Sequence, residues 1–264
     1  MNEQIIEKLS DRMKSLEQVE AARHLDSDKP IIIRLDGKNF SNYTKKLNKP
    51  FDKRLSNIMI ECTKFLMEQS SASIGYTQSD EISLIIVKRN DNEEIFYNGK
   101  IQKITSILAS MLSVKFNQLI EELIPEKKNI PAYFDCRAWN TNNLEEALEV
   151  IVWRRKDAIK NSISMAAHQY YSHKQLHKKN SDEKLALLKQ VGVDWQKYDQ
   201  EHREGSFLAR VEKRLPMPEE YKNFPGNRGK DEIIRQEIET VEFKNELNSF
   251  KQLIYKNSTK LSLK

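Results

Sequence analysis

The fold is decided between residues 31 and 40, where the sequence reads IIIRLDGKNF. The apolar run Ile31–Ile33 predicts a buried β-strand, and Asp36 follows at the end of that strand. A carboxylate is costly to bury unless its charge is paired or binds a cation. We therefore expect Asp36 at the edge of a β-rich core, close to a group that offsets its charge.

A second acidic string, QSDEIS at residues 78–83, runs into the apolar residues 84–87 and predicts another strand. If the two strands are neighbours, Asp36 and Asp80 come together and repel one another, and a hard divalent cation removes that repulsion. Mg²⁺ prefers one or two protein carboxylates together with water and substrate phosphates. The two strings are therefore typical of a metal-dependent nucleotidyl-transfer site in which Asp36 and Asp80 are catalytic.

Glu81, directly after Asp80, is a further catalytic candidate. In a regular strand its side chain lies on the opposite face from that of Asp80. Glu81 would bind a metal if a bulge or turn re-aims it, and otherwise it is a structural carboxylate. Both interpretations stay open from the sequence.

The remaining pattern predicts an α+β fold. Apolar spacing of three and four residues indicates helices over residues 2–24, 52–69, 98–122, 143–172 and 181–191, with a hairpin over 72–88 and a strand over 132–139. The order β-α-β-β-α-β within residues 31–140 is that of a ferredoxin-like split βαβ unit, an antiparallel sheet with packed helices that polymerase palms and nucleotide cyclases use.

Two regions follow from this order of elements. We expect a palm-like catalytic region over residues 1–140 and a mainly helical, basic region over 141–264 that packs on the palm as one compact unit. Prolines and glycines predict a loop over 214–230, and the periodic tail over 231–255 predicts a strand and then a helix.

Composition favours an intracellular protein with a polyanionic partner. Cys62 and Cys136 form no Cys-x-x-Cys pair, which disfavours a disulfide scaffold or a zinc ribbon. The absence of a leader pattern and of a long apolar run predicts a cytoplasmic protein without a membrane span. Residues 151–264 hold 23 Lys and Arg against 16 Asp and Glu, a net charge of +7. Such an excess favours nucleic-acid binding, with a solvated basic surface as the alternative.

Five strings now follow one another along the chain: RLDGKNF from Arg34, KPFD from Lys49, YTQSDE from Tyr76, FDCR from Phe134 and WRRKD from Trp153. Together they resemble the tRNA-His guanylyltransferase superfamily, whose members add nucleotides in the 3′-to-5′ direction to tRNA 5′ ends. The resemblance implies ATP activation of a 5′-monophosphate and then attack by the 3′-hydroxyl of an incoming NTP. It also implies two Mg²⁺ ions, ATP and GTP or other NTPs as substrates, tRNA held at its 5′ end and acceptor stem, and a homo-oligomer, a tetramer.

The resemblance and the residue types together give the site. Asp36, the carbonyl of Gly37 and Asp80 would bind metal. Arg137 is flanked by apolar residues, so we expect it to be buried and to need an anionic partner. The nucleotide-binding candidates are Lys38, Asn39, Phe40, Lys49, Ser79, Lys100, Lys103, Arg137, Asn161 and Lys184.

One departure from the family bears on the substrate. The guanylyltransferases proper carry His-Ile-Asn-Asn after the Trp-Arg string, whereas residues 159–162 here read Ile-Lys-Asn-Ser. The missing His favours the branch of Thg1-like proteins, which repair 5′-truncated tRNAs by template-dependent addition, over a dedicated tRNA-His guanylyltransferase. A nucleotide cyclase would need no basic RNA-binding half, and a non-catalytic RNA-binding protein would need no metal; both remain alternatives.

Overall fold

A six-stranded antiparallel sheet with the strand order β4-β1-β3-β2-β5-β6 forms the centre of the computed structural model, which describes residues 3–88, 93–222, 224 and 231–242. The strands are β1 (Ile31–Gly37), β2 (Ile74–Gln78), β3 (Glu81–Ile86), β4 (Phe134–Asn140), β5 (Ser206–Pro216) and β6 (Glu232–Val241). The order β4-β1-β3-β2, with helices after β1 and β3, is the ferredoxin-like arrangement. The prediction of a palm-like α+β fold is therefore confirmed.

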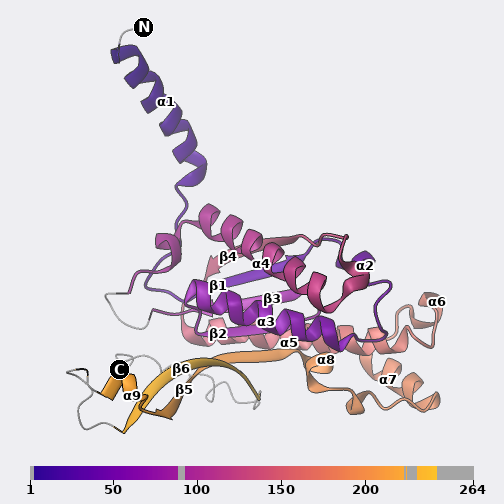
Figure 1. The fold of residues 1–264 in the computed structure, drawn as a ribbon. Coiled ribbons are helices and arrows are strands. Elements are labelled where there is room, and N and C mark those ends of the chain that lie inside the picture. The colour runs from indigo at the N-terminus through magenta and orange to yellow at the C-terminus, as the bar shows by residue number, and fades with distance from the viewer. Residues whose placement is uncertain (1–2, 89–92, 223, 225–230, 243–264) are drawn as a thin grey trace.

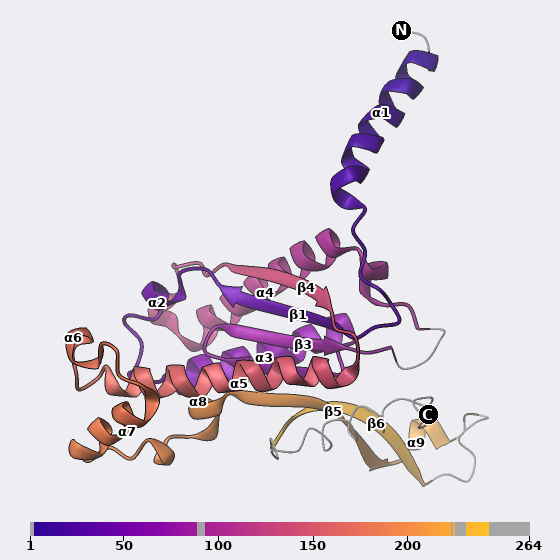
Figure 2. The same cartoon turned by 180° about the vertical axis from the view of Figure 1, so that it is seen from behind.

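Long helices cover both faces of this sheet (Figures 1 and 2). They are α3 (Lys53–Ser70) and α4 (Ile101–Leu123) on one face and α5 (Leu144–Ala167) on the other. Ile31, Ile33 and Leu35 of β1 join the core under α3 and α4, whereas Ile32 joins the core under α5. Since β1 is covered on both faces, its sequence is a continuous apolar run instead of an alternating one.

Shorter helices complete the structure. They are α2 (Phe40–Tyr43), α6 (His173–Leu176), α7 (Ser181–Gln190), α8 (Gln200–Glu204) and α9 (Glu219–Lys222), with 3₁₀ turns η1 (Phe96–Gly99), η2 (Pro125–Lys127) and η3 (Trp195–Lys197). The end of α5 packs with α6 and α7 around Ile163, Leu188 and Trp195. The predicted helices over 143–172 and 181–191 are thus α5 and α7, and α5 begins where the Asn143 side chain accepts a hydrogen bond from the Glu146 amide at 2.9 Å.

The C-terminal half contributes more strand than its local sequence indicates. Strand β5 was not predicted, and the expected loop over residues 214–230 is wrong at its start, where β5 continues to Pro216 in register with Glu232 of β6. Pro216 ends the strand, where its missing amide hydrogen costs little. The strand expected after residue 231 is β6; the helix expected after it falls on residues 243–255, outside the described part of the chain. The division near residue 140 remains a prediction, and β5 and β6 extend the sheet that the first half builds.

The first helix is α1 (Glu3–Ala21), as the sequence predicts, and it projects from the rest of the molecule (Figures 1 and 2). Within the described ranges, no helix is both long enough and apolar enough to cross a lipid bilayer.

Candidate active site

Two neighbouring central strands bring the predicted carboxylates together. Asp36 is the second-last residue of β1, and Asp80 lies in the turn between β2 and β3. Strand β3 pairs directly with β1. Gly37 allows the close approach. A Cβ placed there would lie 2.8 Å from Asp80 Oδ2 and 2.5 Å from the Phe40 ring, so any larger residue would push the Asp80 turn away.

The electrostatics of this pair favour a cation. Burial, followed by the charge of Asp36, raises the pKa of Asp80 to about 6. The Ser79 hydroxyl donates a hydrogen bond to Asp80 Oδ1 at 3.0 Å, which opposes part of that rise. Two carboxylates that are costly to ionise together, next to a backbone carbonyl, form a donor set of hard oxygens that fits Mg²⁺.

Glu81 makes a different contact. Its two carboxylate oxygens accept hydrogen bonds from Arg154 of α5, at 2.6 Å from Nε and 2.7 Å from Nη2. Both side chains are buried, and Arg154 also pairs with Asp157 at 2.7 Å. The bidentate pair fixes α5 against the start of β3, next to the Asp80 turn. This arrangement favours the structural interpretation of Glu81, since its charge is already compensated by Arg154.

A cavity of about 500 Å³ opens beside the carboxylates. Asp36 and Asp80 lie in its wall together with three of the predicted nucleotide-binding residues, Lys49, Ser79 and Asn161. Lys184 of α7 reaches the same wall indirectly, because its ammonium donates to the hydroxyl of Ser164, which lines the cavity, at 2.9 Å. The wall of the cavity therefore combines carboxylates with cationic and amide groups suited to a triphosphate.

The residues that follow Lys49 lead into the start of helix α3. Asp52 is the residue before the helix and accepts from the Arg54 amide at 3.1 Å and from the Asn48 amide at 3.2 Å. The Arg54 side chain also pairs with it at 2.8 Å, and this hydrogen bond is the main cause of the lowered Asp52 pKa. These contacts fix the loop that carries Lys49 and Phe51 into the cavity wall.

Residues 38–40 lie at the turn after β1. The Lys38 amide donates to the Tyr133 carbonyl at 2.8 Å, and Asn39 adopts a left-handed conformation with φ 53°. The Phe40 side chain is buried against Phe116 and Phe134 in the core. Any contact of Phe40 with a nucleotide would therefore come from its backbone.

The structure separates Lys100 and Lys103 from this site. They line a different cavity with Tyr97 and Asn98, at the start of α4. Phe116, thirteen residues further along α4 than Lys103, is the residue that contacts Phe40 near the carboxylates. Thirteen helical residues span roughly 20 Å, so both lysines lie at the far end of the sheet within this chain.

Arg137 differs from its prediction as well. It lies on β4, the edge strand, and its side chain is 54% exposed beside Asp135, at 3.6 Å. The expectation of a buried arginine is wrong because an edge strand is covered less than a central one, a distinction that its apolar neighbours in sequence do not reveal.

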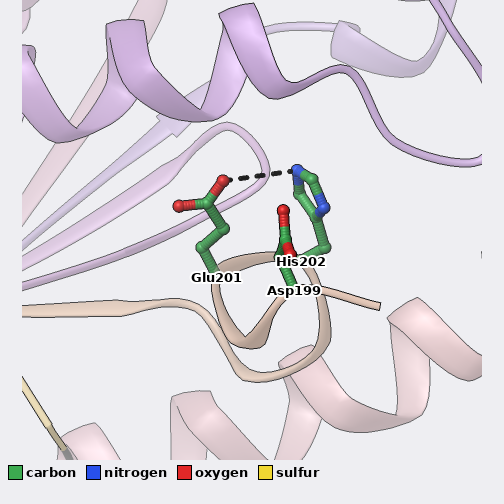
Figure 3. A group of neighbouring side chains, drawn as sticks. All are labelled: Asp199, Glu201 and His202. Carbon is green, nitrogen blue, oxygen red and sulfur yellow. Dashed lines mark ion pairs between the residues drawn. The ribbon is translucent and has the colours of Figure 1, made fainter. Parts of the chain in front are cut away.

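The sequence analysis missed the neighbouring residues Asp199, Glu201 and His202, which Figure 3 shows; Glu201 and His202 also line the cavity. The His202 ring stacks on Phe51 with centroids 5.0 Å apart, and Nε2 lies 3.7 Å from a Glu201 oxygen. Burial lowers the pKa of His202, which favours a neutral imidazole. The ligand atoms of the three residues lie within 4.8 Å of one another, so they are a second place where a cation could bind. Asp199 lies just before α8, and the short spacing of the three residues carries no motif that would mark them in sequence.

Comparison with known proteins adds the family. A family model described as tRNAHis guanylyltransferase (Thg1) matches residues 10–142. The uncharacterized protein R259 of Acanthamoeba polyphaga mimivirus is 30% identical over 214 residues, which cover 72% of this chain and 73% of that protein. The tRNA(His) guanylyltransferase of Candida glabrata is 25% identical over 198 residues, or 68% of this chain and 81% of the other.

Solved structures agree with these matches. A bacterial tRNA(HIS) guanylyltransferase (Thg1)-like protein in complex with ATP superposes with a TM-score of 0.73 and 31% identity, covering 88% of this chain and 91% of that one. Another, in complex with GTP, has a TM-score of 0.74 and 28% identity over 94% and 99% of the two chains. Since the family model spans half of the sequence and the mimivirus relative covers more than two thirds of both chains, this chain belongs to the tRNAHis guanylyltransferase (Thg1) family of nucleotidyltransferases.

Proposed function

We propose that this protein is a template-dependent 3′-to-5′ nucleotidyltransferase that restores missing nucleotides at tRNA 5′ ends. The observation that carries the proposal is the cavity that is lined by Asp36, near the end of β1, by Asp80, in the turn between β2 and β3, and by Lys49 and Asn161. Its size and its mixture of carboxylate and cationic groups suit a nucleoside triphosphate. Bacterial Thg1-like proteins with the same fold have been solved in complex with ATP and in complex with GTP, which supports nucleotides as ligands here.

Asp36, the Gly37 carbonyl and Asp80 are the groups that would hold Mg²⁺. When bound, two such ions would lower the pKa of an attacking hydroxyl and neutralise charge on the departing pyrophosphate. The chain itself supplies the rigid frame. The Glu81–Arg154 pair holds the start of β3 against α5, and Gly37 lets the Asp80 turn approach β1.

The reaction then needs positioning more than a protein nucleophile. In the first step an oxygen of the tRNA 5′-monophosphate attacks the α-phosphorus of ATP, and pyrophosphate leaves. In the second step the 3′-hydroxyl of the incoming NTP attacks the activated 5′-phosphorus, and AMP leaves. Lys49 and Lys184 would stabilise the triphosphate by charge, and Ser79 and Asn161 would orient it by hydrogen bonds.

The tRNA is proposed to bind through phosphates and shape. The basic excess of residues 151–264 would attract the backbone, and phosphate contacts fix position without reading sequence. The opposite 3′ strand would then choose the added nucleotide by base pairing. The sequence Ile159–Ser162, which has no His where dedicated guanylyltransferases carry one, supports this broader substrate range.

The test uses a panel of tRNAs that lack their first nucleotide, with the opposing base varied, incubated with Mg²⁺, ATP and the four NTPs. We expect the complementary nucleotide to be restored on several tRNAs. Guanine added to tRNA-His alone, whatever the opposing base, would instead establish a dedicated guanylyltransferase. Asp36→Ala and Asp80→Ala should be inactive, and Asp135→Ala, an exposed carboxylate on the neighbouring edge strand, is the matched control with activity retained.

The order of steps has its own test. A 5′-triphosphorylated tRNA already carries a leaving group, so addition to it should proceed without ATP, whereas addition to the 5′-monophosphorylated form should require ATP. Equal ATP dependence for both substrates would contradict the two-step scheme.

A further inference from the structure

A cluster of side chains apart from the Asp36–Asp80 pair combines two carboxylates with an imidazole. Asp199 lies just before α8, and Glu201 and His202 lie on that helix (Figure 3). Their ligand atoms lie within 4.8 Å of one another, and no other group of three such residues lies so close within the described ranges. A short stretch of chain therefore brings three metal-ligating side chains together.

Two atoms of the cluster are buried without a partner. Glu201 Oε1 and His202 Nε2 are shielded from solvent, and neither has a hydrogen-bond partner among the residues that the structure describes. The two atoms lie 3.7 Å apart and point toward one another (Figure 3), and the two side chains are only 22% and 11% exposed. Buried polar atoms are nearly always paired, so a cation shared by both atoms would satisfy them together.

We propose that Asp199, Glu201 and His202 bind one divalent transition-metal ion, for which Zn²⁺ is the best fit. Zn²⁺ takes imidazole nitrogen and carboxylate oxygen at about 2.0–2.2 Å, and three protein ligands leave a fourth tetrahedral position for water. Mg²⁺ prefers oxygen ligands in an octahedron, which suits Asp36 and Asp80 better than an imidazole does. The inference is independent of the proposed reaction.

The spacing of the ligand atoms requires little rearrangement. Ligands about 2.1 Å from a tetrahedral ion lie roughly 3.4 Å from one another. Glu201 Oε1 and His202 Nε2 are already 3.7 Å apart, which is close to that spacing. The Asp199 side chain is 56% exposed, so its carboxylate has room to rotate toward the ion. The two buried ligands are therefore nearly in place, and the exposed one completes the site.

Neighbouring side chains orient the ligands. The His202 ring is stacked on the Phe51 ring, with 9° between the ring planes and 5.0 Å between the centroids. Phe51 in turn packs edge-on against Tyr198 at 5.2 Å. The Lys53 ammonium donates to Asp199 Oδ2 at 3.2 Å, which leaves Oδ1 for the ion. Contacts of this kind behind the ligands fix their orientation and raise metal affinity.

A second cavity gives the ion a path to the cluster. This cavity of about 240 Å³ is lined by Asp199, Glu201, Glu242 and Lys53. Three carboxylates against one ammonium give it a negative potential that attracts cations. Glu201 and His202 also line the cavity of about 500 Å³ at the candidate active site. A bound ion would therefore lie in the wall of that larger cavity and be reached from the smaller one.

The experiment is calorimetric titration of the full chain with Zn²⁺ in the presence of excess Mg²⁺. Mg²⁺ competes for Asp36 and Asp80 and leaves a site with an imidazole to Zn²⁺. We expect one Zn²⁺ per chain. The variants Asp199→Asn, Glu201→Gln and His202→Phe each remove one ligand and should weaken Zn²⁺ binding by about tenfold or more. His202→Phe keeps an aromatic ring against Phe51, so its effect reports the lost nitrogen.

Two control variants test other binding places. Asp80→Asn removes a carboxylate from the candidate Mg²⁺ site. His173→Phe removes an imidazole from the pair His168–His173, whose ring centroids are 5.6 Å apart. Both controls should bind Zn²⁺ as the wild type does.

Three results would overturn the proposal: a wild type that binds no Zn²⁺, variants of the cluster that bind like the wild type, or loss of binding in either control. Melting curves recorded with a chelator identify any variant that has not folded, and the remaining cluster variants then decide the question.

Discussion

Replacing Asp80 by Asn should stabilise the metal-free protein even though it removes activity. Burial and the neighbouring Asp36 raise the pKa of Asp80 from 3.8 to about 6. In the unfolded chain the carboxyl keeps its ordinary pKa, so the native state binds more protons between these two values. The free energy of unfolding therefore falls as the pH rises from about 4 to about 6, and above about pH 6 the full cost of the buried charge is present.

The magnitude follows from the shift. About two pKa units, at about 1.4 kcal/mol each, give roughly 3 kcal/mol at pH 8 and about half of that at pH 5. Asn keeps the size of Asp80 without the charge, so Asp80→Asn should gain up to this free energy of unfolding in the presence of a chelator. For a chain of this length each kcal/mol raises the melting temperature by about 2–4 °C.

Thermal unfolding by circular dichroism, at about pH 5 and about pH 8, measures this. Added Mg²⁺ should stabilise the wild type by mass action and leave Asp80→Asn unchanged. The matched control is Asp135→Asn, whose carboxylate is 57% exposed and should change the melting temperature little. An Asp80→Asn protein no more stable than the wild type at pH 8, or a gain that does not depend on pH, would refute the account of the site.

Three further outcomes are expected. Arg154→Met leaves the Glu81 carboxylate buried without its partner and should lower the free energy of unfolding, measured in urea, by about 3–5 kcal/mol. Adding Glu81→Gln should recover part of this loss. Equal stability of Arg154→Met and the wild type would contradict the structural role of the pair. Gly37→Ala puts a methyl group 2.8 Å from Asp80 Oδ2 and should abolish the Mg²⁺-induced rise in melting temperature; a full rise would show that the turn is not confined. Lys49→Ala should weaken ATP binding about tenfold or more in a fluorescence titration, whereas Lys100→Ala should leave it unchanged. The reverse result would indicate that the triphosphate binds in the cavity lined by Lys100 and Lys103 instead.

Local pattern was sufficient for the first half of the fold. Helix α4 follows from its apolar periodicity, and the strands β1, β3 and β4 follow from short apolar or alternating runs in their own sequences. Strand β5 could not be predicted from local sequence. Its partner β2 is distant in sequence, and its other partner β6 follows a stretch rich in proline and glycine. Its pairing is a tertiary effect that no short window contains.

The site divides in the same way. Asp36, Ser79 and Asp80 sit at strand ends, so strand pairing alone brings them together. The lysines could not be placed in this way. Helical spacing indicates which residues share a face of α4, but it does not indicate which end of α4 lies near the carboxylates. Lys100 lies at the end far from them. Glu201 and His202 enter the cavity only because α8 returns to the sheet, a consequence of the whole chain's path.

The pairing of β5 with β2 determines when this edge of the sheet can close during synthesis of the chain. Residues Ile74–Thr77 of β2 pair with Ser206–Ala209 of β5, so the ribosome must make about 130 more residues before that edge is closed. At about 5–20 residues per second this takes on the order of 6–26 s, against far less for the β2–β3 hairpin itself. During that interval the nascent chain carries an open strand edge next to the Asp80 turn, and an open edge is a template for pairing with other chains. A ribosome stalled between Gln78 and Ser206 would therefore release an aggregation-prone product, whereas a chain cut after Ala209 would have its β2 edge closed.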